Sequence, residues 1–255
     1  MSEIERRSEG WIWLVVVFGV ITAMNTIGPV AQYFEHRWPL VSLGAAACIW
    51  VFVAAHAREP WVDRTSRATW LLFSAYLLHG FEVDGIDLLG REFYFQTHVA
   101  VTRGIDLTVG DIMRMNTVSI WLLFTCAVWG GERFPWAGLA AGGVTLANGT
   151  MHTVNSITLG EYNPGLATSL ALFLPGATLY LLHLYRVLDL SRWAIGGAVA
   201  YGVFGHAALL PICVILHSPI WLMAGFAIAP LAANLLAVSL GSGASIRRPV
   251  TARPT

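Results

Sequence analysis

The sequence carries very little charge. Only 12% of its 255 residues are charged, whereas 56% are hydrophobic, and a typical soluble domain has roughly 25% charged residues. A water-soluble chain of this length could not bury that much apolar side chain in one core. The composition therefore excludes an ordinary soluble fold and predicts a protein that lies in membrane lipid.

Lysine is absent, and the formal net charge is zero. The arginines stand singly or in pairs and form no basic patch, so we expect no nucleic-acid partner. The three cysteines, Cys48, Cys126 and Cys213, form no Cys-x-x-Cys pair. This spacing predicts neither a disulfide framework nor a thiolate metal site.

Long apolar stretches are what the sequence does contain. A membrane span needs about 20 mostly apolar residues. The pattern predicts an all-α, polytopic transmembrane helical bundle over residues 1–240, followed by a disordered cytoplasmic tail over residues 241–255. About eight spans are expected, or seven if the last two are one, at residues 11–31, 39–56, 68–90, 112–130, 136–158, 164–185, 193–215 and 219–240.

The distribution of arginines predicts the orientation. Eleven arginines fall on the side of the two termini, and only Arg37, Arg91 and Arg103 fall clearly on the other side. By the positive-inside rule, both termini are cytoplasmic in a multi-pass protein of the cell membrane. The longest loop on the outer side covers residues 91–111 and begins with charged and aromatic residues. It could lie in the headgroup plane or cover a cavity, and the sequence leaves both open.

Polar side chains inside the predicted spans are the candidates for chemistry, because each ionisable group costs about 2.5–3.5 kcal/mol at mid-membrane. The inner ends of the third, fifth and seventh spans fall at residues 68, 136 and 193, and depth in the membrane follows from the position of a residue after each of them. Five polar residues then lie within a slab of roughly 8 Å. They are His79, Glu82, Asn148, His152 and His206.

Two kinds of chemistry suit this layer. His79 and Glu82 are three residues apart and share a helix face, as do Asn148 and His152. With His206, these histidines and the carboxylate offer a ligand set for a divalent metal, zinc or iron, made of His79, Glu82, His152 and His206. Without a metal, the same groups could donate and accept protons.

Other polar residues extend the candidate site. Asp84 approaches the outer edge of the third span. Arg114, at the outer end of the fourth, could pair with Asp84 or Asp87, or could bind an anionic headgroup. His98 falls in the outer loop and is given no role. The candidate catalytic residues are Glu82, Asp84, Asn116, Asn148 and Tyr162.

Three motifs carry a resemblance to a known family. They are His79-Gly-Phe-Glu82, Asn148-Gly-Thr-Met-His152 and Tyr162-Asn163-Pro164-Gly165. Together they resemble the signature of the HXXEE membrane family over roughly residues 68–210. Val83 departs from the pattern, since it replaces the second glutamate, and Asp84 lies one residue on but on a different face. The resemblance implies an integral membrane protein and supports the site, but it implies no activity.

The leading hypothesis is an intramembrane enzyme that acts on a lipid-like or isoprenoid substrate, with membrane lipids as its surroundings. Its chemistry is metal-dependent or acid–base, and isomerase, cyclase and hydrolase are not distinguished. The alternative is a transporter or proton-coupled carrier, which buried His and Glu also suit. The sequence shows no inverted repeat of the kind many carriers have. A structural or partner-binding role is a third possibility, and the oligomeric state is not predicted.

Overall fold

The computed structural model describes residues 3–56, 63–216 and 220–240, and these residues are almost entirely helical. Within them there is no strand, only an isolated bridge between Ile86 and Glu92. The prediction of an all-α fold is therefore confirmed. The elements are α1 (Glu3–Thr26), α2 (Gly28–Glu35), α3 (Trp38–Ala55), α4 (Arg64–Asp84), α5 (Tyr94–Arg103), α6 (Val109–Arg114), η1 (Met115–Trp121), α7 (Leu122–Gly130), α8 (Pro135–Leu159), α9 (Leu166–Thr168), η2 (Ser169–Phe173), α10 (Leu174–Val187), α11 (Arg192–Ile215) and α12 (Ile220–Ser239).

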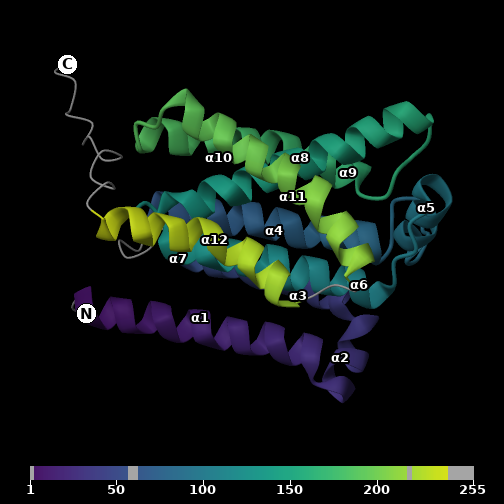
Figure 1. Cartoon of the computed structure of the whole chain (residues 1–255), viewed down its shortest axis with the longest axis horizontal. Coiled ribbons are helices and arrows are strands. Elements are labelled where there is room, and N and C mark those ends of the chain that lie inside the picture. The colour runs from purple at the N-terminus through teal and green to yellow at the C-terminus, as the bar shows by residue number, and fades with distance from the viewer. Residues whose placement is uncertain (1–2, 57–62, 217–219, 241–255) are drawn as a thin grey trace.

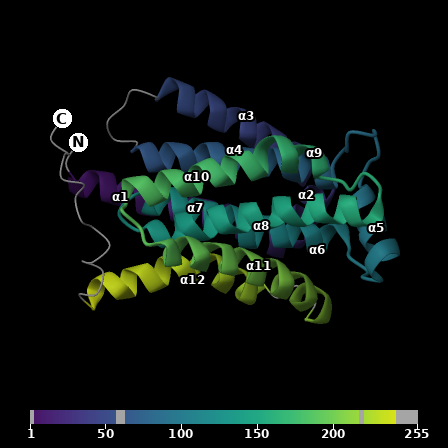
Figure 2. The ribbon, with the colours of Figure 1, turned by 90° about the horizontal axis from the view of Figure 1, so that it is seen from above.

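The long helices lie side by side along one axis of the molecule (Figures 1 and 2). Helix α1 begins and α12 ends at the same end of this bundle, and the short helices α5, α6 and α9 lie at the opposite end. Helix α8 is central, because it packs against α7, α10, α11 and α12. We refer to the end that carries α5 as the α5 end.

Several helices are long and apolar enough to span a membrane, as predicted, but fewer than eight. In the described part of the chain, four segments qualify by length and composition: α3, α12, Val109–Gly130 and Leu166–Val187. A fifth is reached when α1 and α2 are counted as one bent span. The prediction of eight spans is therefore wrong on this measure. The predicted disordered tail, residues 241–255, lies outside the described residues.

Two of the predicted spans that do not qualify have a physical explanation. Helices α4 and α8 occupy the predicted third and fifth spans, but they carry the charged and amide side chains of the candidate site, which lower their average hydropathy. Much of each helix is buried in the protein. The predicted first span, 11–31, is bent by 87° between α1 and α2. Pro29 follows this break, and proline can neither donate a backbone hydrogen bond nor fit against the preceding turn of a helix.

Glycines allow α8 and α11 to approach each other closely. A Cβ atom on Gly143 of α8 would lie 1.8 Å from the carbonyl oxygen of Ala198 in α11, and one on Gly202 would lie 2.1 Å from the carbonyl oxygen of Gly143. The two backbones therefore touch where any larger side chain would hold them apart, as small residues allow in membrane helix pairs. This contact orients α11, which carries His206, against α8.

Candidate functional site

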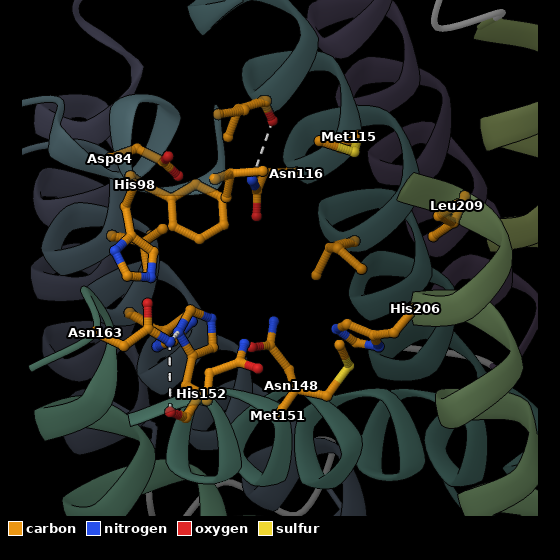
Figure 3. A pocket seen from close by; sticks show the side chains of 18 of the residues that line it. Asp84, His98, Met115, Asn116, Asn148, Met151, His152, Asn163, His206 and Leu209 are labelled. Atoms are coloured by element: carbon orange, nitrogen blue, oxygen red, sulfur yellow. Dashed lines mark hydrogen bonds between the residues drawn. The ribbon is translucent and has the colours of Figure 1, made fainter. Parts of the chain in front are cut away.

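A cavity of about 180 Å³ lies at the α5 end, between α4, α5, η1, α8 and α11 (Figure 3). Apolar side chains such as Val99, Ile120 and Leu209 form part of its wall. The polar side chains that line it are Tyr76, His79, Asp84, His98, Thr102, Asn116, Asn148, His152, Asn155, Asn163 and His206. The structure thus brings together most of the predicted site, but Glu82 and Tyr162 lie outside this lining.

Helical periodicity explains how α8 supplies one wall. Asn148, Met151, His152, Asn155 and Leu159 are spaced by three or four residues, which places them on one face of the helix. That face points into the cavity in Figure 3, where Asn148, Met151 and His152 lie together.

Helix α4 supplies the facing wall through Tyr76, His79 and Val83, which follow the same spacing. Tyr76 was not predicted as a site residue, although its position three residues before His79 placed it on this face. Its hydroxyl oxygen accepts a hydrogen bond from Asn148 Nδ2 at 2.8 Å. This bond joins α4 to α8 beside the two histidines.

The rings of His79 and His152 are neighbours, with centroids 4.7 Å apart and planes at 82°. The backbone of Gly165 packs against both of them. A Cβ atom there would lie 2.6 Å from His79 Cε1 and 3.0 Å from His152 Cε1, and Gly165 has a φ of +88°. Space and backbone conformation both require glycine at this position, which gives the Tyr-Asn-Pro-Gly motif a structural reason.

The hydrogen bonds of Thr168 determine which nitrogen of His79 carries the proton. The Thr168 hydroxyl donates its single proton to Glu82 Oε2. The 2.7 Å contact between His79 Nδ1 and Thr168 Oγ1 then requires the imidazole to be the donor. In the neutral ring, Nε2 therefore carries a lone pair and can act as a base.

His152 has the opposite arrangement. Its Nδ1 lies 3.1 Å from Asn163 Nδ2, an amide nitrogen that can only donate. The neutral ring therefore carries its proton on Nε2, and the protons of both rings are assigned from their partners. One of the two adjacent imidazoles presents an acceptor and the other presents a donor.

Glu82 is buried and fully engaged by the protein. Its carboxylate accepts hydrogen bonds from the Tyr162 hydroxyl, the Thr168 hydroxyl, and the backbone N–H groups of Ala167 and Thr168 at 3.1 and 2.8 Å. These N–H groups open the helical run of α9, η2 and α10, where the helix dipole favours a negative charge. Glu82 thus holds this helix start against α4 and reaches His79 through Thr168.

Tyr162 serves as a donor in this network. Burial and the neighbouring Glu82 raise the pKa of its phenol above the ordinary value, so the hydroxyl keeps its proton. Arg91 stacks over the Tyr94 ring at 3.7 Å and faces the Tyr162 ring at 5.7 Å. The predicted catalytic position of Tyr162 is therefore next to Glu82, at the edge of the site.

The predicted metal ligands do not form one set. Glu82 has its lone pairs occupied by four donors, and His206 Nδ1 lies 3.0 Å from the carbonyl oxygen of Gly202. Among the residues that the structure describes, no group of three or more His, Cys, Asp or Glu side chains could hold a metal ion. The residues present therefore do not fit a shared zinc or iron, and no step below involves a metal.

Asp84 lines the cavity, although its face of α4 was expected to differ from that of His79. It is the last residue of α4 and only 1% exposed. Among the described residues, neither carboxyl oxygen has a hydrogen-bond partner. Neither pairing considered for Arg114 is found, because Arg114 pairs with Asp111 at 2.9 Å and Asp87 pairs with Arg91 at 2.6 Å. Binding of an anionic headgroup by Arg114 stays a prediction.

Helix α5, in the outer loop, lines the cavity, which agrees with the prediction that this loop covers a cavity; a position in the headgroup plane stays a prediction. Its residues Phe95, His98, Val99 and Thr102 all line the cavity. Their spacing of three and four residues would have indicated a helix with one inward face. His98, which was given no role, is 5% exposed and faces the site.

The remaining predicted residues complete the walls. Asn116, in η1, donates from Nδ2 to the Ile112 carbonyl at 3.0 Å within its own helix. Asn116 faces the cavity from the side opposite α8 (Figure 3). His206 enters from α11 beside Leu209. The roles predicted for these residues remain predictions, but their gathering around one cavity is observed.

The comparisons with known proteins agree with the sequence resemblance over part of the chain. No curated protein and no solved structure matches. A family model matches residues 70–180, which contain His79, Glu82, His152 and Tyr162 but end before His206. The match is therefore shorter than the expected residues 68–210. Residues 70–180 match the family described as proteins of unknown function with an HXXEE motif.

Proposed function

We propose that this protein is a membrane-embedded enzyme that performs acid–base chemistry on a lipid-like or isoprenoid substrate in the cavity at the α5 end. The observation that carries the proposal is the pair of adjacent imidazoles, His79 and His152, whose hydrogen-bond partners assign them complementary protonation. A positioned base beside a positioned donor is the arrangement that proton transfer needs.

The proposed reaction is an isomerisation by proton transfer. His79 Nε2 takes a proton from one atom of the substrate, while the Nε2–H of His152 donates a hydrogen bond to a polar group of the same molecule. The imidazolium at His79 is stabilised by Thr168 and, through it, by the Glu82 carboxylate. His79 then returns the proton to the far end of the adjacent double bond, two bonds from the atom that lost it, so that the double bond shifts by one position and no co-reactant is consumed.

The role of Glu82 in this proposal is positioning. A carboxylate that orients a histidine and stabilises its charged form is a familiar part of catalytic triads. In this protein the connection runs through the Thr168 hydroxyl. Glu82 therefore acts on the base without touching the substrate.

The walls of the cavity support a lipid-like substrate. Met151 and Leu159 line the cavity and are also 39% and 43% exposed, so they border its opening with apolar surface. Several helices of the bundle fit a membrane. We place both termini on the cytoplasmic side of the cell membrane, because most arginines lie on their side of the chain and α1 begins at the same end as α12 ends.

Deuterium labelling tests the proposal. Membranes containing the protein are incubated in ²H₂O, and their lipids are analysed by mass spectrometry for deuterium on carbon and for new isomers. We expect signals that disappear in His79→Gln and His152→Gln variants and persist in a His36→Gln variant, because His36 is exposed and far along the chain from the cavity residues. Lipids that are identical with wild-type and His79→Gln protein would refute the proposal.

A carrier is the second candidate, and one observation favours it. A second cavity of about 710 Å³ lies between the first halves of α8 and α11 and the second half of α12, lined by Trp136 and Tyr201 among others. The contact between Gly143 and Gly202 lies between the two cavities along α8 and α11. Uptake into proteoliposomes that requires His79, without any change to the solute, would favour the carrier over the enzyme.

A further inference from the structure

Among the described residues, the cavity wall offers one carboxyl group but no side chain with a permanent positive charge. Asp84 contributes a carboxyl group, and none of the described residues that line the cavity is an arginine. The chain has no lysine. Two arginines near the lining residues in sequence are already paired, Arg91 with Asp87 and Arg114 with Asp111. An anionic group such as a phosphate would therefore meet a carboxyl group and no lining arginine or lysine, so that only the four lining histidines, when protonated, could offer it a positive charge.

The unsatisfied hydrogen-bonding atoms point the same way. Among the described cavity residues, the buried atoms without a partner are both oxygens of Asp84, Oδ1 of Asn148 and Oδ1 of Asn163. The two amide oxygens can only accept, and both Asp84 oxygens accept when its carboxyl group is ionised. Buried polar atoms in native proteins normally have hydrogen-bond partners. These four oxygens therefore favour a ligand that carries several hydrogen-bond donors.

We infer that the cavity binds a ligand through a protonated amine, and this inference rests on the proposed function by naming its substrate class. An ammonium group brings three N–H donors and a positive charge. The charge would pair with Asp84, and a buried carboxylate needs such a partner. Tyr76 and Phe95 add aromatic rings to the wall, and aromatic faces attract cations. The apolar opening beside Met151 and Leu159 would accept an attached hydrocarbon chain.

Binding of defined probes to the purified protein in detergent tests this inference. The probes are decylamine, decanol and decyl phosphate, which share a chain and differ in the head group. Propylamine and lysophosphatidylethanolamine are added to separate a free amine from the amine of a lipid headgroup. Dissociation constants are measured by calorimetry for the wild type and for Asp84→Asn, with Asp106→Asn as the control because Asp106 is exposed.

We expect wild-type protein to bind decylamine about tenfold more tightly than decanol, which corresponds to one charge-assisted hydrogen bond, and not to bind decyl phosphate. Asp84→Asn should lose the preference for the amine, and Asp106→Asn should keep it. Asp84→Glu retains the carboxyl group and should keep at least part of the preference, so it serves if Asp84→Asn does not fold. Stronger binding of lysophosphatidylethanolamine than of decylamine would assign the amine to a lipid headgroup.

Equal affinities for decylamine in the wild type and Asp84→Asn would overturn the inference, as would a preference for decyl phosphate. This failure is separate from that of the proposed function. If the amine preference is absent but His79-dependent deuterium labelling persists, only the ligand class is wrong. If amine binding is present without labelling, the acid–base reaction is wrong and the binding site stands.

Discussion

Two carboxylic acids lie two residues apart on α4, and the protein surrounds them very differently. Glu82 accepts hydrogen bonds from two hydroxyls and two backbone N–H groups. Asp84, which is more deeply buried, accepts none from any described residue. Burial alone therefore does not distinguish a structural acid from one that is available to a ligand. What distinguishes them is whether the donors are supplied by the protein itself.

The comparison assigns different tasks to the two groups. Glu82 joins α4 to the start of α9 and, through Thr168, orients His79. Asp84 lies at the cavity wall with unused acceptors. Mutations of Glu82 and its hydrogen-bond donors should therefore act mainly on stability, and mutations of Asp84 should act mainly on ligand binding.

Replacing Glu82 should have the largest effect. Glu82→Ala leaves the hydroxyls of Tyr162 and Thr168 and two backbone N–H groups without their acceptor. We expect a loss of about 3–5 kcal/mol in the free energy of unfolding, as when one partner of a buried charged network is removed. Chemical unfolding in detergent, followed by circular dichroism, measures it. A loss no greater than that of Asp84→Asn would contradict the structural role of Glu82.

The next largest effect is expected at Gly165, where a matched control exists. Gly165→Ala should cost about 1–3 kcal/mol for its backbone conformation and should also displace His79 and His152. Gly160→Ala has a similar φ of +66° but no atom within 4 Å of the added Cβ. The control should therefore lose stability but keep His79-dependent labelling, whereas Gly165→Ala should lose both. Equal effects in the two variants would show that contact with the imidazoles is unimportant.

A smaller effect is expected at Tyr162. Tyr162→Phe removes one of the four donors to Glu82 and keeps the ring beside Arg91. We expect a loss of about 1–2 kcal/mol, the usual range for one hydrogen bond to a charged group, measured by the same unfolding experiment. If the variant is as unstable as Glu82→Ala, Tyr162 carries the whole network and the other donors do not contribute.

The smallest effect on stability is expected at Asp84. Asp84→Asn removes a carboxyl group that no described residue bonds, so the free energy of unfolding should change by less than about 1 kcal/mol. The unfolding curve of this variant is compared with that of Asp106→Asn. A larger loss would mean that Asp84, like Glu82, supports the fold, and the contrast between the two acids would disappear.

Much of the candidate site could be predicted from one-dimensional patterns. The spacing of Asn148 and His152, and the depth shared by His79 and His206, depend only on helical geometry, and the structure brings these side chains to one cavity. The first span was mispredicted because hydropathy averages over the bend before Pro29. Glu82 was misplaced for a related reason, since periodicity gives a helix face but not the partner that the face meets.

By itself, the sequence determined the all-helical fold, the apolar character of the bundle and the polar residues available for chemistry, because these follow from composition and from periodicity within each helix. Only the tertiary structure decided that the Glu82 carboxylate accepts hydrogen bonds from the start of α9, that α5 lines the cavity, and that the carboxyl oxygens of Asp84 have no partner among the described residues. Those outcomes depend on which donors arrive from distant segments, such as Ala167 and Thr168 beside Glu82. A hydrogen bond needs both partners in place, and a local pattern describes only one of them.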